Sequence, residues 1–127
     1  MLNILLVAVG GGAGAVARYA LSLQALRWLG AGWPYGTLAA NALGGLLMGL
    51  LAGGLAQRSG GDADRWRLLL GVGVLGGFTT FSAFSLEVVQ MTDRRAWGEA
   101  AAYALGSVAL SVGAVFVGLL LIRRLLA

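Results

Sequence analysis

Four long apolar segments fill most of this sequence, and they constrain its fold more than any other feature. They run over residues 2–26, 34–56, 68–91 and 97–122. Each is long enough to cross about 30 Å of hydrocarbon as a helix, which takes about 20 residues. Because lipid offers the backbone no hydrogen bonds, only helices and closed barrels cross it. The sequence therefore predicts an all-α membrane protein with four transmembrane helices in one domain, residues 1–127.

Composition excludes several classes of function. With 59% hydrophobic and 11% charged residues, the chain is too apolar for a soluble domain of 127 residues. It has no His and no Cys, so disulfides, the commonest metal ligands and the commonest general bases are missing. No paired carboxylates replace them, which argues against an enzyme. The basic residues are all Arg at helix ends, without a basic face carrying aromatics, so no nucleic acid is expected as a partner.

The arginines are almost evenly divided between the two sides of the predicted membrane. One side would hold Arg58, Arg65, Arg67, Arg123 and Arg124, and the other Arg27, Arg94 and Arg95. The side richer in Arg normally faces the cytoplasm. A bias this small leaves insertion in one orientation or in both as open alternatives, and dual topology is one hypothesis.

The third segment contains a stretch that is unusual for a membrane helix. Residues 71–87 read GVGVLGGFTTFSAFSLE. The glycines lower helix propensity by roughly 1 kcal/mol each relative to Ala, and the hydroxyl residues Thr79, Thr80, Ser82 and Ser85 follow closely. Non-helical backbone at membrane depth is tolerated only where it is buried in protein or lines a watery path. We therefore expect the third helix to be broken in mid-membrane and to mark a functional site.

Two phenylalanines, Phe81 and Phe84, share a helix face within this stretch. Core packing is the simpler interpretation, but it does not require the interleaved hydroxyls of Thr80 and Ser82. The edge of an aromatic ring carries partial positive charge, so two rings presented edge-on would stabilise a small anion beside those hydroxyls. Glu87, near the end of the segment, is more readily explained as an interfacial carboxylate than as part of a pathway.

The second and fourth segments each carry a stripe of polar and small residues. Thr37, Asn41, Gly45, Gly49 and Gly53 recur every four residues in the second, and Tyr103, Ser107 and Ser111 in the fourth. Such spacing lets helices pack closely. Asn41 either bonds a neighbouring helix or offers its NH₂ to an anion in a hydrated path. The serines either bond back to the preceding turn or coordinate a permeating ion.

The first segment places Gly10, Gly14 and Arg18 on one face. The glycines predict close approach of another helix. Arg18 has two interpretations. Its side chain either extends to the membrane surface, or it gives a vestibule the positive charge that attracts anions.

Three motifs together resemble the CrcB/Fluc family of fluoride channels. They are GAGAVARY at 12–19, PYGTLAANALGGLLMG at 34–49 and GGFTTFSAFSLE at 76–87, of which the last is the most specific. The resemblance implies an antiparallel, dual-topology homodimer in the bacterial plasma membrane, with two fluoride pores and a central structural sodium ion. It implies passive, electrodiffusive export of cytoplasmic fluoride, which would confer fluoride resistance.

The resemblance also implies roles for individual residues. The anion pathway would contain Asn41, Phe81, Phe84, Tyr103, Ser107 and Ser111, joined by the hydroxyls of Thr80 and Ser82. Main-chain carbonyls of Gly76 and Thr79 from both subunits would hold sodium, and Arg18 would stand near the cytoplasmic entrance. Ala83 departs from the family, which often has Thr there, so one hydroxyl is missing.

Two rival functions come from other classes. A small proton-coupled drug exporter also has four helices and dual topology, but it needs a coupling carboxylate in its first spans, and residues 1–56 contain none. A structural subunit without transport activity would need the hydroxyls only to join helices. Fluoride efflux measured beside chloride efflux separates these alternatives.

Overall fold

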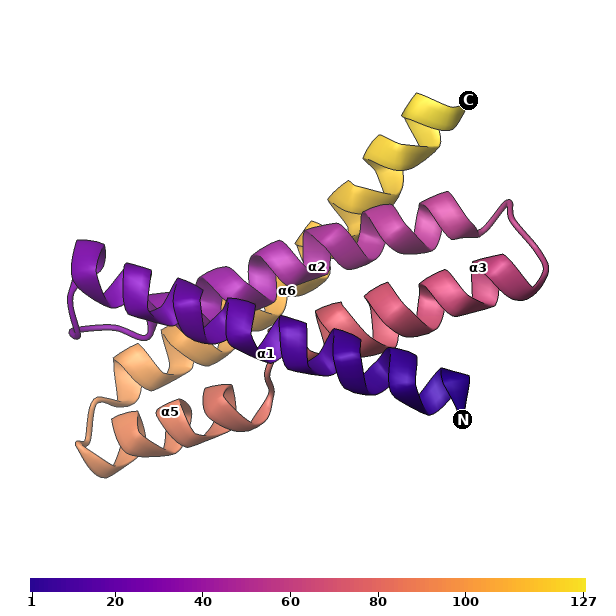
Figure 1. The fold of residues 1–127 in the computed structure, drawn as a ribbon. Coiled ribbons are helices and arrows are strands. Elements are labelled where there is room, and N and C mark those ends of the chain that lie inside the picture. Colours follow the sequence, from indigo (N-terminus) through magenta and orange to yellow (C-terminus); the bar gives the residue numbers. More distant parts are fainter.

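Four helical spans lie side by side in the computed structural model, which describes residues 1–127 (Figure 1). In chain order the helices are α1 (Leu2–Leu29), α2 (Tyr35–Leu55), α3 (Gly61–Trp66), the π-helical segment η1 (Arg67–Leu75), α4 (Gly76–Phe78), α5 (Ser82–Asp93) and α6 (Trp97–Leu126). The four elements from α3 to α5 make up the third span. All four spans are long and apolar enough to cross a membrane, as the sequence predicted.

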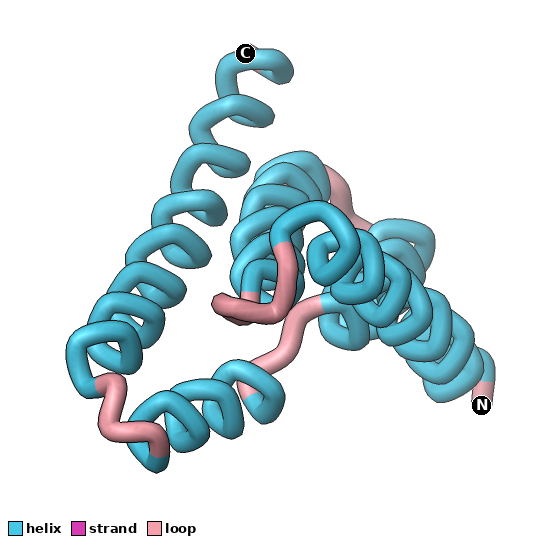
Figure 2. Tube along the Cα trace, turned by 90° about the vertical axis from the view of Figure 1, so that its left-hand side faces the viewer, coloured by secondary structure: helices cyan, strands magenta, loops and turns pink.

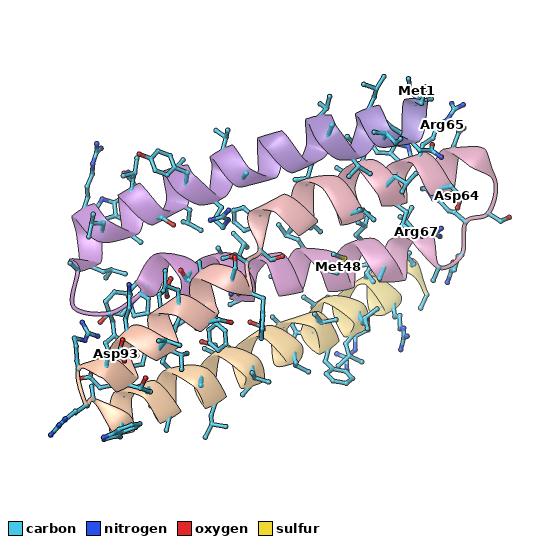
Figure 3. The ribbon with its side chains drawn as sticks, turned by 90° about the horizontal axis from the view of Figure 1, so that it is seen from below. Met1, Met48, Asp64, Arg65, Arg67 and Asp93 are labelled. Carbon is cyan, nitrogen blue, oxygen red and sulfur yellow. The ribbon has the colours of Figure 1, made fainter.

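Charged side chains gather at the two ends of the bundle (Figure 3). Both termini lie at the end that carries the α2–α3 connection, together with Asp64, Arg65 and Arg67 (Figures 1 and 3). Asp93 lies at the opposite end, beside the α5–α6 connection. The long apolar middle of the bundle is the part that fits the hydrocarbon layer.

The third span begins earlier than the sequence predicted. The connection was expected over residues 57–67, but α3 already occupies Gly61–Trp66. Its first turn carries Asp62 and Asp64, and carboxylates are favoured at the partial positive charge of a helix start. Each also pairs with the arginine one turn on, at 3.9 Å to Arg65 and 2.7 Å to Arg67. These local contacts extend the helix into the polar connection.

Glycines allow α1 to approach the third span closely. A Cβ atom added at Gly10 would overlap the carbonyl oxygen of Leu69, and one at Gly14 would overlap that of Val74. Both glycines are buried. The face predicted from their spacing is therefore the face that contacts η1.

The glycine stripe of α2 packs against α6. Added Cβ atoms at Gly45 and Gly49 would clash with carbonyl oxygens of α6, and one at Gly118 of α6 would clash with the carbonyl of Leu46. Because only glycine allows backbones to meet this closely, the stripe sets the distance between the two helices. The polar residues that precede it on α2 are thereby held beside α6.

The backbone leaves the helical conformation between α4 and α5. Helix α4 ends at Phe78, Thr79 is extended with φ −83° and ψ 157°, and α5 begins at Ser82. Figure 2 shows this connection as a loop between two helical pieces. The polar groups that this non-helical turn exposes must be satisfied within the protein.

The packing of α1 on η1 predicts opposite effects for two neighbouring glycines. Gly14→Ala forces a methyl group into the backbone of the third span and should lower the free energy of unfolding by about 1–3 kcal/mol. Gly12→Ala is the matched control, because nothing lies within 4 Å of its added Cβ, and it should be neutral or stabilising by up to about 1 kcal/mol. Thermal unfolding in detergent measures both, and equal midpoints would contradict the packing.

Candidate functional site

A hollow of about 400 Å³ lies among α2, the interruption of the third span, α5 and α6. Its lining includes six of the eight residues predicted for an anion pathway: Asn41, Thr80, Phe81, Phe84, Ser107 and Ser111. Tyr103 and Ser82 are outside it. We call this space the central hollow.

Asn41 of α2 clasps the peptide groups of Thr80. Its Nδ2 donates to the Thr80 carbonyl at 3.0 Å, and its Oδ1 accepts from the Thr80 N–H at 2.8 Å. The sequence left open whether Asn41 joins helices or serves an anion, and the geometry provides for both. The amide joins α2 to the third span, and the second hydrogen of its NH₂ has no partner within the chain, while the residue lines the central hollow.

The interruption leaves two carbonyl oxygens without donors. In a continuous helix the N–H of Thr80 would bond to Gly76, and the N–H of Ala83 would bond to Thr79. Instead these N–H groups donate to Asn41 Oδ1 at 2.8 Å and to Thr80 Oγ1 at 3.2 Å. No turn, loop or side-chain hydrogen bond ends on the carbonyls of Gly76 and Thr79. Free carbonyl oxygens suit a hard cation such as sodium, so these two residues fit the predicted role.

Ser107 has a buried hydroxyl with no hydrogen-bond partner. The residue is 4% exposed, and its Oγ is the one buried side-chain polar atom left unpaired. The simpler prediction for this serine, a hydrogen bond back to the preceding turn of α6, is therefore wrong. Leaving such a group unpaired costs about 1–3 kcal/mol. Ser107 is also one of the residues that line the central hollow.

A row of aromatic rings leads from the central hollow toward the α1–α2 connection. Phe81 and Phe84 have ring centroids 5.7 Å apart, Phe84 and Tyr103 5.3 Å, and Tyr103 and Trp33 5.6 Å. Phe84 is half-buried, whereas Phe81 is 78% exposed in the single chain. The predicted pair of rings is thus adjacent, and one of the two is uncovered.

Glu87 is part of a hydrogen-bonded group that sequence reasoning missed. The Thr37 hydroxyl donates to its Oε1 and the Tyr103 hydroxyl to its Oε2, each at 2.6 Å. The carboxylate is therefore held between α2 and α6 by two hydroxyl groups, and its interfacial position stays a prediction. The spacing along the helices could have indicated this group. Thr37 and Tyr103 lie one turn before Asn41 and Ser107 on the same helix faces, and Glu87 lies two turns after Thr80.

Arg18 and Ser82 lie apart from the central hollow. Arg18 projects from α1, and its Nε donates to the Gly77 carbonyl at 3.3 Å. It is half-buried and does not line the central hollow, and its extension to the membrane surface stays a prediction. Ser82 is exposed, with its Oγ 3.3 Å from Thr80 Oγ1. The vestibule role of Arg18 and the pathway role of Ser82 remain predictions.

The sequence of the chain decides its family. The family described as "CrcB-like protein, Camphor Resistance (CrcB)" matches residues 5–119. The chain belongs to the CrcB family. The match covers the central hollow with every helix that forms it. The resemblance drawn from the three motifs is therefore confirmed.

Several relatives of this CrcB chain match it over its full length or nearly so. The "Fluoride-specific ion channel FluC" of Phenylobacterium zucineum is 71% identical over 127 residues, all of both chains. Proteins of the same name from Caulobacter sp. strain K31 and Caulobacter vibrioides are 58% identical over 125 residues, 98% of each chain, and 53% identical over 127 residues, all of both. The CrcB family is one of ion channels and not of enzymes, as the sequence predicted.

The clasp between Asn41 and Thr80 predicts a local change when it is removed. Asn41→Ala leaves the N–H and C=O of Thr80 without partners and should cost about 1–3 kcal/mol for each buried group. Hydrogen–deuterium exchange should then quicken over the interruption, while η1 stays protected. Leu43→Ala is the control, because that side chain is exposed on the outside of the same helix. Unchanged exchange at Thr80 in the Asn41 variant would contradict the role of the clasp.

Proposed function

We propose that this chain forms a fluoride-selective channel that exports cytoplasmic fluoride by passive electrodiffusion and so confers fluoride resistance. Full-length relatives named as fluoride-specific ion channels support the proposal. The observation that carries it is the unpaired, buried Ser107 hydroxyl in a hollow that also contains an amide donor and two phenylalanine rings. The bacterial plasma membrane is the proposed location.

The chemistry of the central hollow suits fluoride better than larger halides. Fluoride is small and strongly hydrated, so a selective site replaces its water with several donors at close range. The Ser107 and Ser111 hydroxyls, the Asn41 amide and the edges of the rings are such donors. No cationic side chain lines the hollow, so an ion is held weakly enough to leave, as conduction requires.

The Thr37–Glu87–Tyr103 group continues the route beyond the aromatic pair. The hydroxyl groups of Thr37 and Tyr103 both donate to the Glu87 carboxylate. A small anion between these two hydroxyl groups would accept the same hydrogen bonds. A fluoride ion that reaches Tyr103 from Phe84 therefore competes with Glu87 for hydroxyl donors that are already in position. In this proposal the polar track runs Ser111, Ser107, Tyr103 and then Thr37.

We propose that two copies assemble as an antiparallel, dual-topology homodimer with two pores. A single chain leaves the central hollow incompletely covered, because Phe81, Val108 and Val112 line it and are 78%, 56% and 52% exposed. In a membrane these residues would meet lipid unless another protein surface covered them. The small arginine bias between the two ends is compatible with insertion in both orientations.

A structural sodium ion is proposed at the interruption of the third span, which we place in mid-membrane. The carbonyls of Gly76 and Thr79 lack donors within the chain and would be the ligands. One chain offers too few oxygens to enclose the ion, so the same carbonyls of a second copy would complete the site. The ion would bind carbonyl oxygens that find no hydrogen-bond donor in lipid.

Purified protein in liposomes tests the channel function. Fluoride efflux should be rapid and chloride efflux should stay near that of empty liposomes. Phe81→Ile should lower fluoride efflux by about tenfold, because losing an aromatic edge contact worth up to about 1.5 kcal/mol changes an equilibrium by that factor. Phe116→Ile, on an exposed position of α6, is the matched control. Equal efflux of both anions, or none of either, would refute the assignment, and normal conduction by the Phe81 variant would refute the role of its ring.

Sodium removal tests the proposed cation. Protein extracted and purified in N-methylglucamine buffer without sodium should lose fluoride efflux and dissociate from dimer to monomer. Without sodium, the carbonyls of Gly76 and Thr79 in the two copies no longer bind a shared cation. Light scattering after size-exclusion chromatography measures the mass, and adding sodium back should restore both properties. A dimer with full efflux after sodium-free purification would contradict the site.

A further inference from the structure

A second hollow, of about 350 Å³, lies at the opposite side of the Thr37–Glu87–Tyr103 group. It is lined by the last turns of α1, the α1–α2 connection, the start of α2 and the end of α5. Its lining includes the polar residues Ser22, Thr37, Glu87, Gln90 and Arg94. We call it the end hollow. It shares no lining residue with the central hollow.

The two hollows are separated by a thin partition of side chains. Thr37 and Glu87 line the end hollow and Phe84 lines the central hollow, whereas Tyr103 lines neither but contacts Glu87 and Phe84. Its hydroxyl bonds Glu87 at 2.6 Å, and its ring lies 5.3 Å from that of Phe84. An ion that passes this partition from the central hollow therefore enters the end hollow.

The end hollow extends to the water-facing end of the bundle. Its wall includes residues 30–34 of the α1–α2 connection, and it reaches Arg94, which is exposed just after α5. Arg94 is the one cationic residue in the lining, and Glu87 is the one acidic residue there. Three neighbours with charge, Arg27, Asp93 and Arg95, do not line it.

We propose that the end hollow is the aqueous mouth of the fluoride route, and that Arg94 is the residue that concentrates fluoride there. This inference rests on the proposed function. A fixed positive charge in a narrow, low-dielectric opening raises the local concentration of anions. It also offsets the repulsion that an entering anion meets from the Glu87 carboxylate. Arg18, the basic residue that the sequence suggested for an entrance, lines neither hollow.

Neutralising Arg94 tests the charge. At an ionic strength of about 10 mM, where charges act over about 30 Å, Arg94→Gln should lower fluoride efflux at least about twofold, and at about 1 M, where they act over about 3 Å, the difference should vanish. Arg95→Gln is the matched control, with the same charge change one residue away and outside the lining. Its efflux should equal that of the unmodified protein at both salt concentrations.

A cysteine variant tests the opening independently, since the natural chain has no cysteine. Gln90→Cys puts a thiol in the wall of the end hollow, and Ser59→Cys puts one in the connection at the other end of the bundle. Modification with a negatively charged methanethiosulfonate should reduce fluoride efflux through the Gln90 variant and leave the Ser59 variant unchanged.

The outcomes separate this inference from the proposed function. If unmodified protein conducts fluoride while Arg94→Gln matches Arg95→Gln at both salt concentrations, the role of Arg94 is refuted. If Gln90→Cys is fully modified without loss of efflux, the end hollow is not the mouth. If unmodified protein conducts no fluoride at all, the channel assignment falls, and this inference falls with it.

Discussion

The two hydrogen bonds between the Asn41 amide and the peptide groups of Thr80 support the rest of the site. A turn of non-helical backbone inside an apolar bundle is stable only if its polar groups find partners, because lipid supplies none. Asn41 provides a donor and an acceptor at 3.0 and 2.8 Å. Since Thr80 bonds to a side chain, the Gly76 carbonyl is left free, and Thr79 takes an extended conformation. One amide on α2 thus satisfies the peptide groups of Thr80 where the third span is interrupted.

Glycine packing keeps that amide in place. Gly45 and Gly49 bring α2 against α6, and Gly10 and Gly14 bring α1 against η1. Close backbone contact leaves little freedom for the helices to slide or rotate. The polar residues therefore meet with short hydrogen bonds, while the Ser107 hydroxyl remains unpaired beside the central hollow. A channel needs both properties, a rigid frame and donors that the protein itself does not use.

The central hollow, the Thr37–Glu87–Tyr103 group and the end hollow follow one another along the bundle. Phe81 and Phe84 stand on one side of Tyr103, and Thr37 and Glu87 on the other. The hydroxyl groups of Thr37 and Tyr103 stand next to the aromatic rings, so hydroxyl donors and ring edges follow one another along this line, beside the Glu87 carboxylate that accepts from both hydroxyls. The only full positive charge in the linings belongs to Arg94, at the water-facing end.

Hydrophobic length and helical period are local properties, so the sequence alone determined the four spans and the glycine faces. The resemblance of its motifs to a family added six of the residues that line the central hollow. Sequence reasoning misjudged residues 61–66, where ion pairs extend a helix into a polar connection, and it missed the hydrogen bonds of Glu87 with Thr37 and Tyr103. Only the tertiary structure decided which stripes meet. The contacts of Asn41 with Thr80 and of Thr37 with Glu87 join residues 39 and 50 positions apart. Such pairings depend on how helices rotate and shift against each other, and no local pattern specifies that.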